Sequence, residues 1–181
     1  MRFGSLIIAG LAAVASAIPA AKVVENIKTV ASLSTKLQTP TKDLSVLDGP
    51  LLAIGSGNFP PVIKGFTEIV NTVSGALNNM DEEKYSPADS DLIFDAFRTF
   101  VMVHQELLNI LIGKAGLFNT VPLVGKPVAS VLHAVEGVVD SLANSLIDMM
   151  ESRTMEMKEE ALALGSTLGT CIGSYEGLSL N

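Results

Sequence analysis

The stretch from Ser86 to Ile112 has the pattern of one long helix with an unusually broad apolar face. At about 100° per residue, its large apolar side chains and one histidine fall close together, and most of its charged side chains fall opposite. The residues of this face are Ile93, Phe97, Phe100, His104, Leu107, Leu108 and Leu111. Its apolar arc spans roughly 200°, whereas a surface helix typically buries ~100°. Such a helix needs neighbours on several sides, so we expect it to be central.

The start of this helix carries its own signals. Ser86 suits the N-cap, Pro87 suits the first helical position, and Asp89 stands three residues after the cap. Each of these residues satisfies or tolerates the unpaired amides at a helix N-terminus, and the acid also favours the positive end of the helix dipole. The sequence therefore predicts a helix that begins at Ser86 or Pro87.

Four further stretches show apolar residues at helical spacing, and no stretch shows a convincing strand alternation. They cover residues 20–38, 61–79, 126–150 and 154–176. Pro40 either ends or kinks the first of them, with Leu44 and Leu47 continuing its apolar face. Residues 51–61 contain several Gly and Pro residues and predict a loop or a broken helix. We expect an all-α, up-and-down bundle of about five helices, folded as a single domain over residues 18–181.

Residues 1–17 form a secretory signal pattern. Arg2 supplies the positive charge, residues 6–14 are apolar, and Ala15-Ser16-Ala17 is a cleavage pattern. We therefore expect a secreted, extracellular protein whose mature chain begins at Ile18. The C-terminal residues lack the hydrophobic tail of a glycolipid anchor signal, so we expect release and not tethering.

The charge and the motif content exclude several classes of function. The formal net charge is −7 and the basic residues are scattered, which argues against nucleic acid as a partner. The single cysteine, Cys171, cannot form a disulfide within the chain. The acidic run Asp81-Glu82-Glu83 lacks the ligand spacing of a calcium loop. Because phosphate-loop, dinucleotide and metalloprotease motifs are also missing, we expect no cofactor, no metal site and no catalysis.

Two histidines and one cysteine are the remaining candidates for chemistry. His104 lies in the middle of the broad apolar face, and three roles are open to it. It is a core residue with a hydrogen-bond partner, or it meets the polar head of a ligand in a cavity, or it forms a reactive pair with Cys171. His133 lies two turns before Asp140 on a solvent face and lacks a third metal ligand.

The last two helices carry two further patterns. Gly165, Gly169 and Gly173 follow one another at four-residue spacing, which predicts close approach of a neighbouring helix. Four methionines gather around the connection between these helices, where flexible side chains suit an irregular core or an adaptable apolar surface. They are Met149, Met150, Met155 and Met157.

A resemblance to a known family rests on the order of these segments. A Val/Ile-rich first helix is followed by Leu117-Phe118, then by Val121-Pro122-Leu123-Val124-Gly125, which leads into a long Val/Leu helix. This order resembles the fungal hydrophobic surface binding protein A family, which includes the cell-wall galactomannoproteins. The likeness covers about residues 20–176. It implies a secreted fungal helical bundle, and its members either hold fatty acids between helices or adsorb to hydrophobic surfaces and help recruit secreted esterases.

We therefore expect a non-catalytic protein that binds a fatty acid or another apolar small molecule within its bundle. The alternative is adsorption to hydrophobic surfaces as an adaptor for esterases. The sequence lacks a Ser/Thr-rich tail, so covalent attachment to the cell wall is not expected. From helix faces alone, we expect the ligand-binding residues to be Phe66, Phe97, Phe100, Val101, His104, Val135, Leu142 and Tyr175.

Overall fold

A computed structural model describes residues 18–80, 83–119, 121 and 124–179, and the predicted signal peptide at residues 1–17 lies outside this part. All regular structure in the described residues is helical, as the sequence predicts. The six α-helices are α1 (Ala20–Lys42), α2 (Asp48–Leu52), α3 (Phe59–Leu77), α4 (Pro87–Ala115), α5 (Gly125–Met149) and α6 (Thr154–Glu176). Single 3₁₀ turns follow α4, α5 and α6. No described helix is both long enough and apolar enough to cross a membrane.

The predicted bounds agree closely for most of the helices. Those of α6 coincide with the prediction, whereas α3 begins two residues earlier and α4 ends three residues later than expected. The main corrections concern the segment after α1. Pro40 lies inside α1, which ends at Lys42 and does not continue through Leu44 and Leu47. The short helix α2 follows, and its last two residues fall in the stretch that we expected to be a loop or a broken helix. Leu44 is buried as predicted, but Leu47 is 77% exposed, so its assignment to the core face is wrong.

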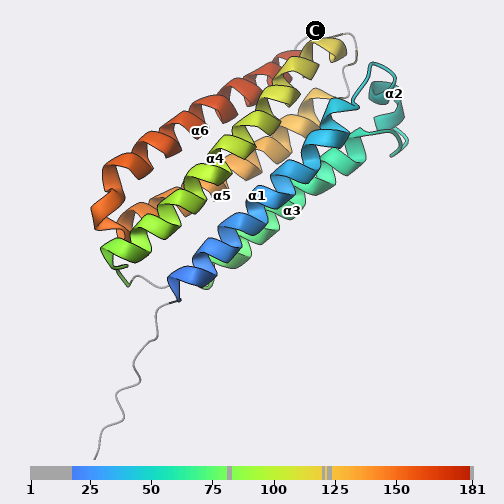
Figure 1. Ribbon diagram of the computed structural model, residues 1–181. Coiled ribbons are helices and arrows are strands. Elements are labelled where there is room, and N and C mark those ends of the chain that lie inside the picture. The colour runs from blue at the N-terminus through green and yellow to red at the C-terminus, as the bar shows by residue number, and fades with distance from the viewer. Residues whose placement is uncertain (1–17, 81–82, 120, 122–123, 180–181) are drawn as a thin grey trace, which may run out of the picture.

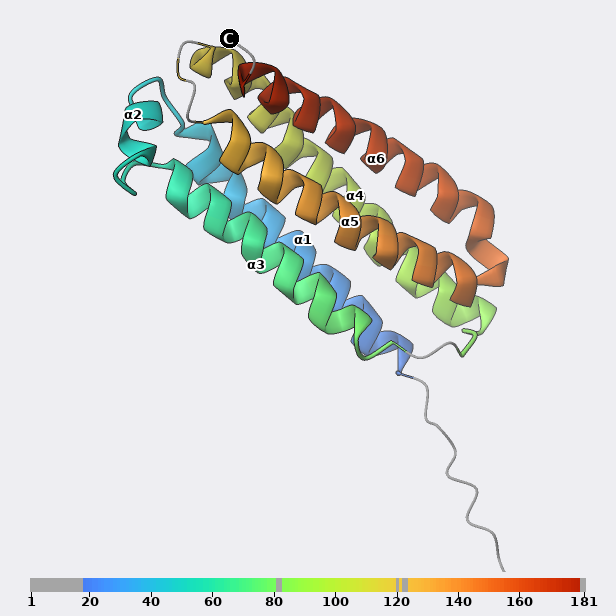
Figure 2. The same ribbon diagram turned by 180° about the vertical axis from the view of Figure 1, so that it is seen from behind.

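The five long helices form a closed ring in two layers. α1, α4 and α6 make one layer, with α4 in the middle, and α3 and α5 make the other (Figures 1 and 2). Packing runs from α1 to α4, α6, α5, α3 and back to α1. The three helices of the first layer run in one direction, and the two of the second run in the opposite direction (Figure 1). The chain thus alternates up and down, but α3–α4 and α4–α5 are not ring neighbours.

The position of α4 explains its broad apolar arc. Its two flanks pack on α1 and α6, and the face between these flanks is directed at the second layer. A helix that packs on one side buries only a narrow apolar stripe, whereas α4 is covered on three of its sides and needs apolar residues on all of them. The predicted N-cap is present, because the Ser86 hydroxyl oxygen accepts a hydrogen bond of 3.2 Å from the amide of Asp89. The structure therefore confirms α4 as the helix around which the core is built.

One end of the bundle is covered by the segment that contains α2. The buried carboxylate of Asp48 accepts hydrogen bonds from the amide and hydroxyl of Ser45 and from the amide of Asn58, at 2.7–2.8 Å. Burial by itself raises the pKa of Asp48, but these hydrogen bonds outweigh it and hold the pKa below its ordinary value. Lys114 donates to the carbonyl oxygens of Lys42 and Leu44 (Lys114 Nζ to Leu44 O, 2.8 Å). These contacts fix the segment on the helix ends.

Close helix approach occurs at a glycine that the sequence pattern did not indicate. A Cβ atom at Gly65 of α3 would lie 2.1 Å from Cδ2 of Leu37 on α1. By contrast, a Cβ atom at Gly165, Gly169 or Gly173 would meet nothing within 4 Å. The prediction that these three glycines face a neighbouring helix is therefore wrong. Among the contacts between the described long helices, the α1–α3 contact is therefore the one in which a Cβ atom on glycine would collide with a neighbouring side chain.

Gly65→Ala should destabilise the protein and Gly169→Ala should stabilise it. At Gly65 an overpacking penalty of about 1–3 kcal/mol opposes a gain of ~1 kcal/mol in helix propensity, for a net loss of about 1 kcal/mol. At Gly169 only the gain applies. Thermal unfolding should show shifts of about 2–4 °C in opposite directions. Equal shifts for both variants would contradict the close contact.

Candidate functional site

The eight predicted ligand-binding residues all lie in the core. Phe66 comes from α3, four come from α4, two from α5, and Tyr175 from α6. Seven of them are 0% exposed, and Leu142 is 3% exposed. The structure places Phe66 and Phe100 beside His104, with ring centroids 6.2 and 5.3 Å from the imidazole, and Phe97 is 6.0 Å from Phe100. That they bind a ligand stays a prediction.

Side chains fill the space around these residues. Side chains that line an internal cavity large enough for water have solvent-accessible surface. These eight side chains have almost none. The structure therefore shows no water-sized space beside these eight side chains. An acyl chain could enter only if the two layers move apart or if core side chains change rotamer.

The side chain of His104 is a polar group enclosed by this core. Its Nδ1 lies 2.9 Å from Oγ of Ser34 on α1, and the Ser34 hydroxyl lies 3.0 Å from the carbonyl oxygen of Val30. The Ser34 hydroxyl has one proton, and its contact with the Val30 carbonyl is a hydrogen bond only if that proton is directed at Val30. We therefore assign Ser34 as the donor to Val30 and Nδ1–H as the donor to Ser34. Nε2 then carries a lone pair, and it has no hydrogen-bond partner among the described residues.

Burial keeps His104 neutral. Loss of hydration lowers the pKa of the imidazole from 6.5 to about 4, and no neighbouring charge contributes to this shift. At neutral pH the interior therefore holds an uncharged imidazole with one unused acceptor atom. This finding supports the first role predicted for His104, a core residue with a hydrogen-bond partner, but only one of its two nitrogens is satisfied.

The hypothesis of a reactive His104–Cys171 pair is wrong. One nitrogen of His104 is bonded to Ser34, and the other has no partner among the described residues, the Cys171 thiol included. Cys171 is fully buried on α6, and burial raises the pKa of its thiol to about 12. The sulfur is thus protonated at neutral pH, and a protonated thiol is a poor nucleophile.

Tyr175 is one of the expected ligand-binding residues, but its hydroxyl proton is already used in a hydrogen bond within the core. Its hydroxyl donates a hydrogen bond of 2.9 Å to the carbonyl oxygen of Leu111 on α4. Burial raises the pKa of Tyr175, so the hydroxyl stays neutral. This bond ties α6 to the last part of α4 and leaves Tyr175 able only to accept.

Sequence reasoning missed the roles of two serines. Neither Ser34, on α1, nor Ser90, on α4, was given a role from the sequence. Both are 0% exposed, and the hydroxyl of Ser90 has no partner among the described residues. Both serines could have been found by the rule that singled out His104, which is that a polar residue at a core position of a helix is unusual.

The surface carries the remaining polar candidates. His133 is exposed as predicted, and its ring nitrogens contact the carboxylates of Glu176 (2.9 Å) and Glu136 (3.3 Å), which raise its pKa. No cluster of three metal-ligating side chains occurs in the described part of the chain. A groove of 860 Å³ runs between α5 and α6, and Asp140, Ile147 and Leu162 are among the residues that line it.

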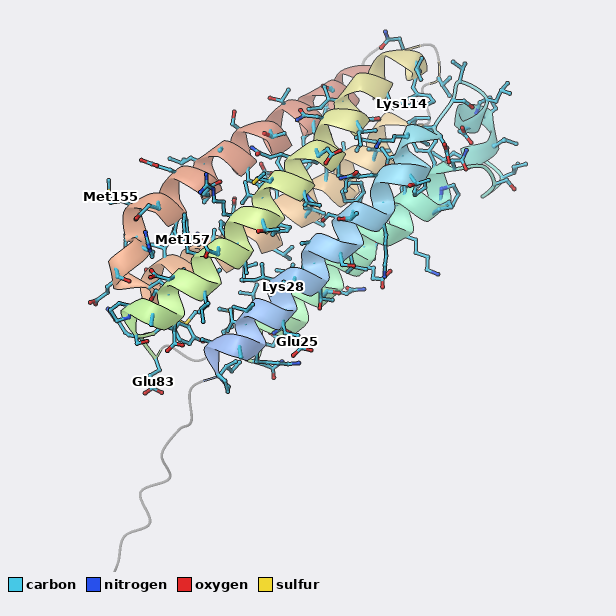
Figure 3. All side chains as sticks on the ribbon, viewed as in Figure 1. Glu25, Lys28, Glu83, Lys114, Met155 and Met157 are labelled. Atoms are coloured by element: carbon cyan, nitrogen blue, oxygen red, sulfur yellow. The ribbon has the colours of Figure 1, made fainter. Side chains whose placement is uncertain are left out.

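The methionines divide between the core and the surface. Met149, Met150 and Met157 are buried where α5 joins α6, whereas Met155 is 69% exposed on the outside of α6 (Figure 3). Three of the four therefore fill an irregular junction, and one is free for surface contact.

Solved structures that share this fold include two helical proteins with bound fatty acids. The crystal structure of AFMP4P in complex with palmitic acid has a TM-score of 0.74 and 16% identity, covering 86% of this chain and 99% of that one. Ligand binding domain 1 of the Penicillium marneffei MP1 protein, complexed with arachidonic acids, has a TM-score of 0.67 and 15% identity, covering 86% and 95%. No protein-family model and no curated protein matches the sequence. At sequence identities of 15–16%, the similarity to these two structures shows that this chain shares their fold.

His104 should make the protein less stable in acid, and His104→Leu should reduce this loss. Because the pKa is lower in the folded state, the neutral imidazole's contribution is complete above pH 6.5 and declines as the pH falls to about 4. The loss amounts to about 3 kcal/mol for a fully buried group. Urea unfolding between pH 7.5 and 4.5 should show a shallower decline for His104→Leu than for the wild type. His133→Leu is the control and should decline at least as steeply as the wild type, because the raised pKa of His133 stabilises the folded state in acid. Parallel curves for wild type and His104→Leu would contradict the assignment.

Proposed function

We propose that this protein binds fatty acids or similar apolar molecules between its two helix layers and does so without catalysis. The observation that carries the proposal is its fold, which it shares over nearly the whole length of two helical proteins solved with palmitic or arachidonic acid. The signal pattern predicted at residues 1–17 supports the extracellular space, including the cell-wall region, as the place of action.

The core has the composition that such binding requires. All five long helices contribute apolar side chains to one continuous core, so an acyl chain between the layers would contact apolar atoms along its length. Burial of apolar surface yields about 25 cal/mol per Å². Because the core is filled, part of this energy separates the helices or moves core side chains, and we expect a wider ring in the complex.

Palmitic acid should form a complex with the delipidated protein and raise its melting temperature. A ligand at about 100 times its Kd stabilises the folded state by about 2.7 kcal/mol, which for a chain of this size means a shift of several degrees. Native mass spectrometry should show the added mass of the ligand. An unchanged mass and an unchanged melting temperature would remove the proposal.

Two neighbouring residues of α5 test whether the ligand lies inside the ring. Val135 is 0% exposed in the core, and Ala134 is exposed on the outer side of the same helix. Val135→Phe should weaken palmitate binding by about tenfold or more, because it adds volume where the ligand must fit. Ala134→Phe adds volume outside the core and should bind as the wild type does. Equal binding by both variants would place the ligand elsewhere, for example in the α5–α6 groove.

A second function, adsorption to hydrophobic surfaces, is favoured by one specific observation. Four apolar side chains are exposed in or beside α2, at one end of the bundle. This α2 patch consists of Val46 (50% exposed), Leu47 (77%), Leu51 (38%) and Ile54 (74%). The hydrogen bonds of Asp48 hold the segment in place, so the patch is a built surface that suits contact with wax or polyester. In this reading the protein would be an adaptor that brings secreted esterases to such a surface.

Removing the α2 patch should weaken adsorption to hydrophobic beads. Leu47→Ser combined with Ile54→Ser should lower the partition coefficient by about tenfold or more, since each side chain is worth about 1 kcal/mol when half buried against a surface. Leu92→Ser combined with Leu162→Ser is the control, because these leucines are exposed elsewhere (59% and 74%). Equal loss in both double variants would argue against a dedicated patch.

A further inference from the structure

The unused lone pair of His104 restricts what kind of polar head the interior can accept. Nδ1 is committed to Ser34, and the Ser34 hydroxyl is committed to Val30. The remaining atom, Nε2, can only accept a hydrogen bond while the imidazole is neutral. A carboxylate offers acceptors alone, whereas a carboxylic acid or an alcohol offers an O–H donor.

The surroundings of His104 supply no charge that could pair with an anion. Ser34 faces it from α1, Phe66 from α3, and Phe100 from its own helix. The titratable groups in the core of α6 are Cys171 and Tyr175, both neutral. The core residues contributed by α5 are all uncharged. The charged residues of these helices lie outside the buried set, for example Glu25 and Lys28 on α1 (Figure 3).

Burying an unpaired carboxylate in such a place is costly. The desolvation penalty of a single ion amounts to several kcal/mol even after relaxation, so the complex avoids it if the head group is neutral or if its proton is shared with His104. In water, a carboxyl group has a pKa of about 4.3, so the free ligand is an anion at neutral pH. A proton must therefore be taken from solvent when the ligand enters.

We propose that the interior takes up a fatty acid together with one proton, with the carboxyl O–H donating to Nε2 of His104. The inference rests on the proposed function and names the head-group chemistry of the same site. The free carboxylate and one proton from solvent give the bound acid, so charge balances. The proton count is the same whether the shared proton stays on the carboxyl oxygen or moves to Nε2.

The test compares three ligands of equal chain length on the folded wild-type protein. Palmitic acid, hexadecan-1-ol and methyl palmitate differ only in their heads, which are ionisable, neutral with a donor, and neutral without a donor. Binding of radiolabelled ligand is measured between pH 6 and 8. Palmitic acid should lose about tenfold in affinity per pH unit, or about 100-fold over the range. The alcohol and the ester should change by less than about twofold, because neither exchanges a proton in this range.

Calorimetry in two buffers of different ionisation enthalpy counts the proton directly. It should report one proton taken up with palmitic acid at pH 7 and none with the alcohol. Binding of all three ligands with a pH-independent affinity for the acid would overturn the inference and leave the proposed function standing. Failure of all three ligands to bind would overturn the proposed function itself.

A variant locates the proton at His104. His104→Leu removes the acceptor, so at pH 6 it should lower the affinity for the acid relative to the methyl ester by about tenfold, the value of one hydrogen bond. His133→Leu is the matched control and should leave the acid-to-ester ratio unchanged. Circular dichroism confirms that each variant is folded. An unchanged acid-to-ester affinity ratio in His104→Leu would show that the head group lies elsewhere. The comparison of the three ligands on the wild-type protein is independent of both variants.

Discussion

The exclusion of water from the space between the two helix layers is the constraint on which the rest of the structure depends. α4 buries three directions at once, and it can do so only because α1 and α6 cover its flanks while α3 and α5 close the opposite side. No disulfide can replace this packing, since Cys171 is the single cysteine. Stability and any binding of apolar ligands therefore draw on the same contacts.

Because the stability of the fold depends on apolar packing, the polar side chain of His104 in the core has a free-energy cost. A leucine at this position would pack without a polar atom to satisfy, whereas a buried imidazole with one unpaired nitrogen costs free energy of the order of 1–3 kcal/mol. The partners Ser34 and Val30 on α1 recover only part of that cost. A core that carries such a residue is less stable than it could be, and a head group that supplies a donor would restore the missing bond.

Much of the fold could be predicted because it depends on periodicity. The helical spacing of apolar residues located all five long helices, and the cap at Ser86 placed the start of α4. The order of the helices around the ring could not be predicted, because it depends on which helix flanks pack together. The role of Gly65 could not be predicted either, because only its neighbour Leu37 explains why a side chain is missing there. At the site, His104 stood out as a polar residue on an apolar face, but its bond to Ser34 joins residues seventy positions apart.

The unequal numbers of helices in the two layers have an electrostatic consequence. Three helices point one way and two the other (Figure 1), so their dipoles cannot cancel fully, and about one helix dipole remains, worth roughly half a charge at each end. Its negative end coincides with the α2 end, where Lys42 and Lys114 stand in the last turns of α1 and α4. The electrostatic potential thus differs between the two ends of the bundle, and an amphiphile that inserts between the layers would meet a different potential at each end.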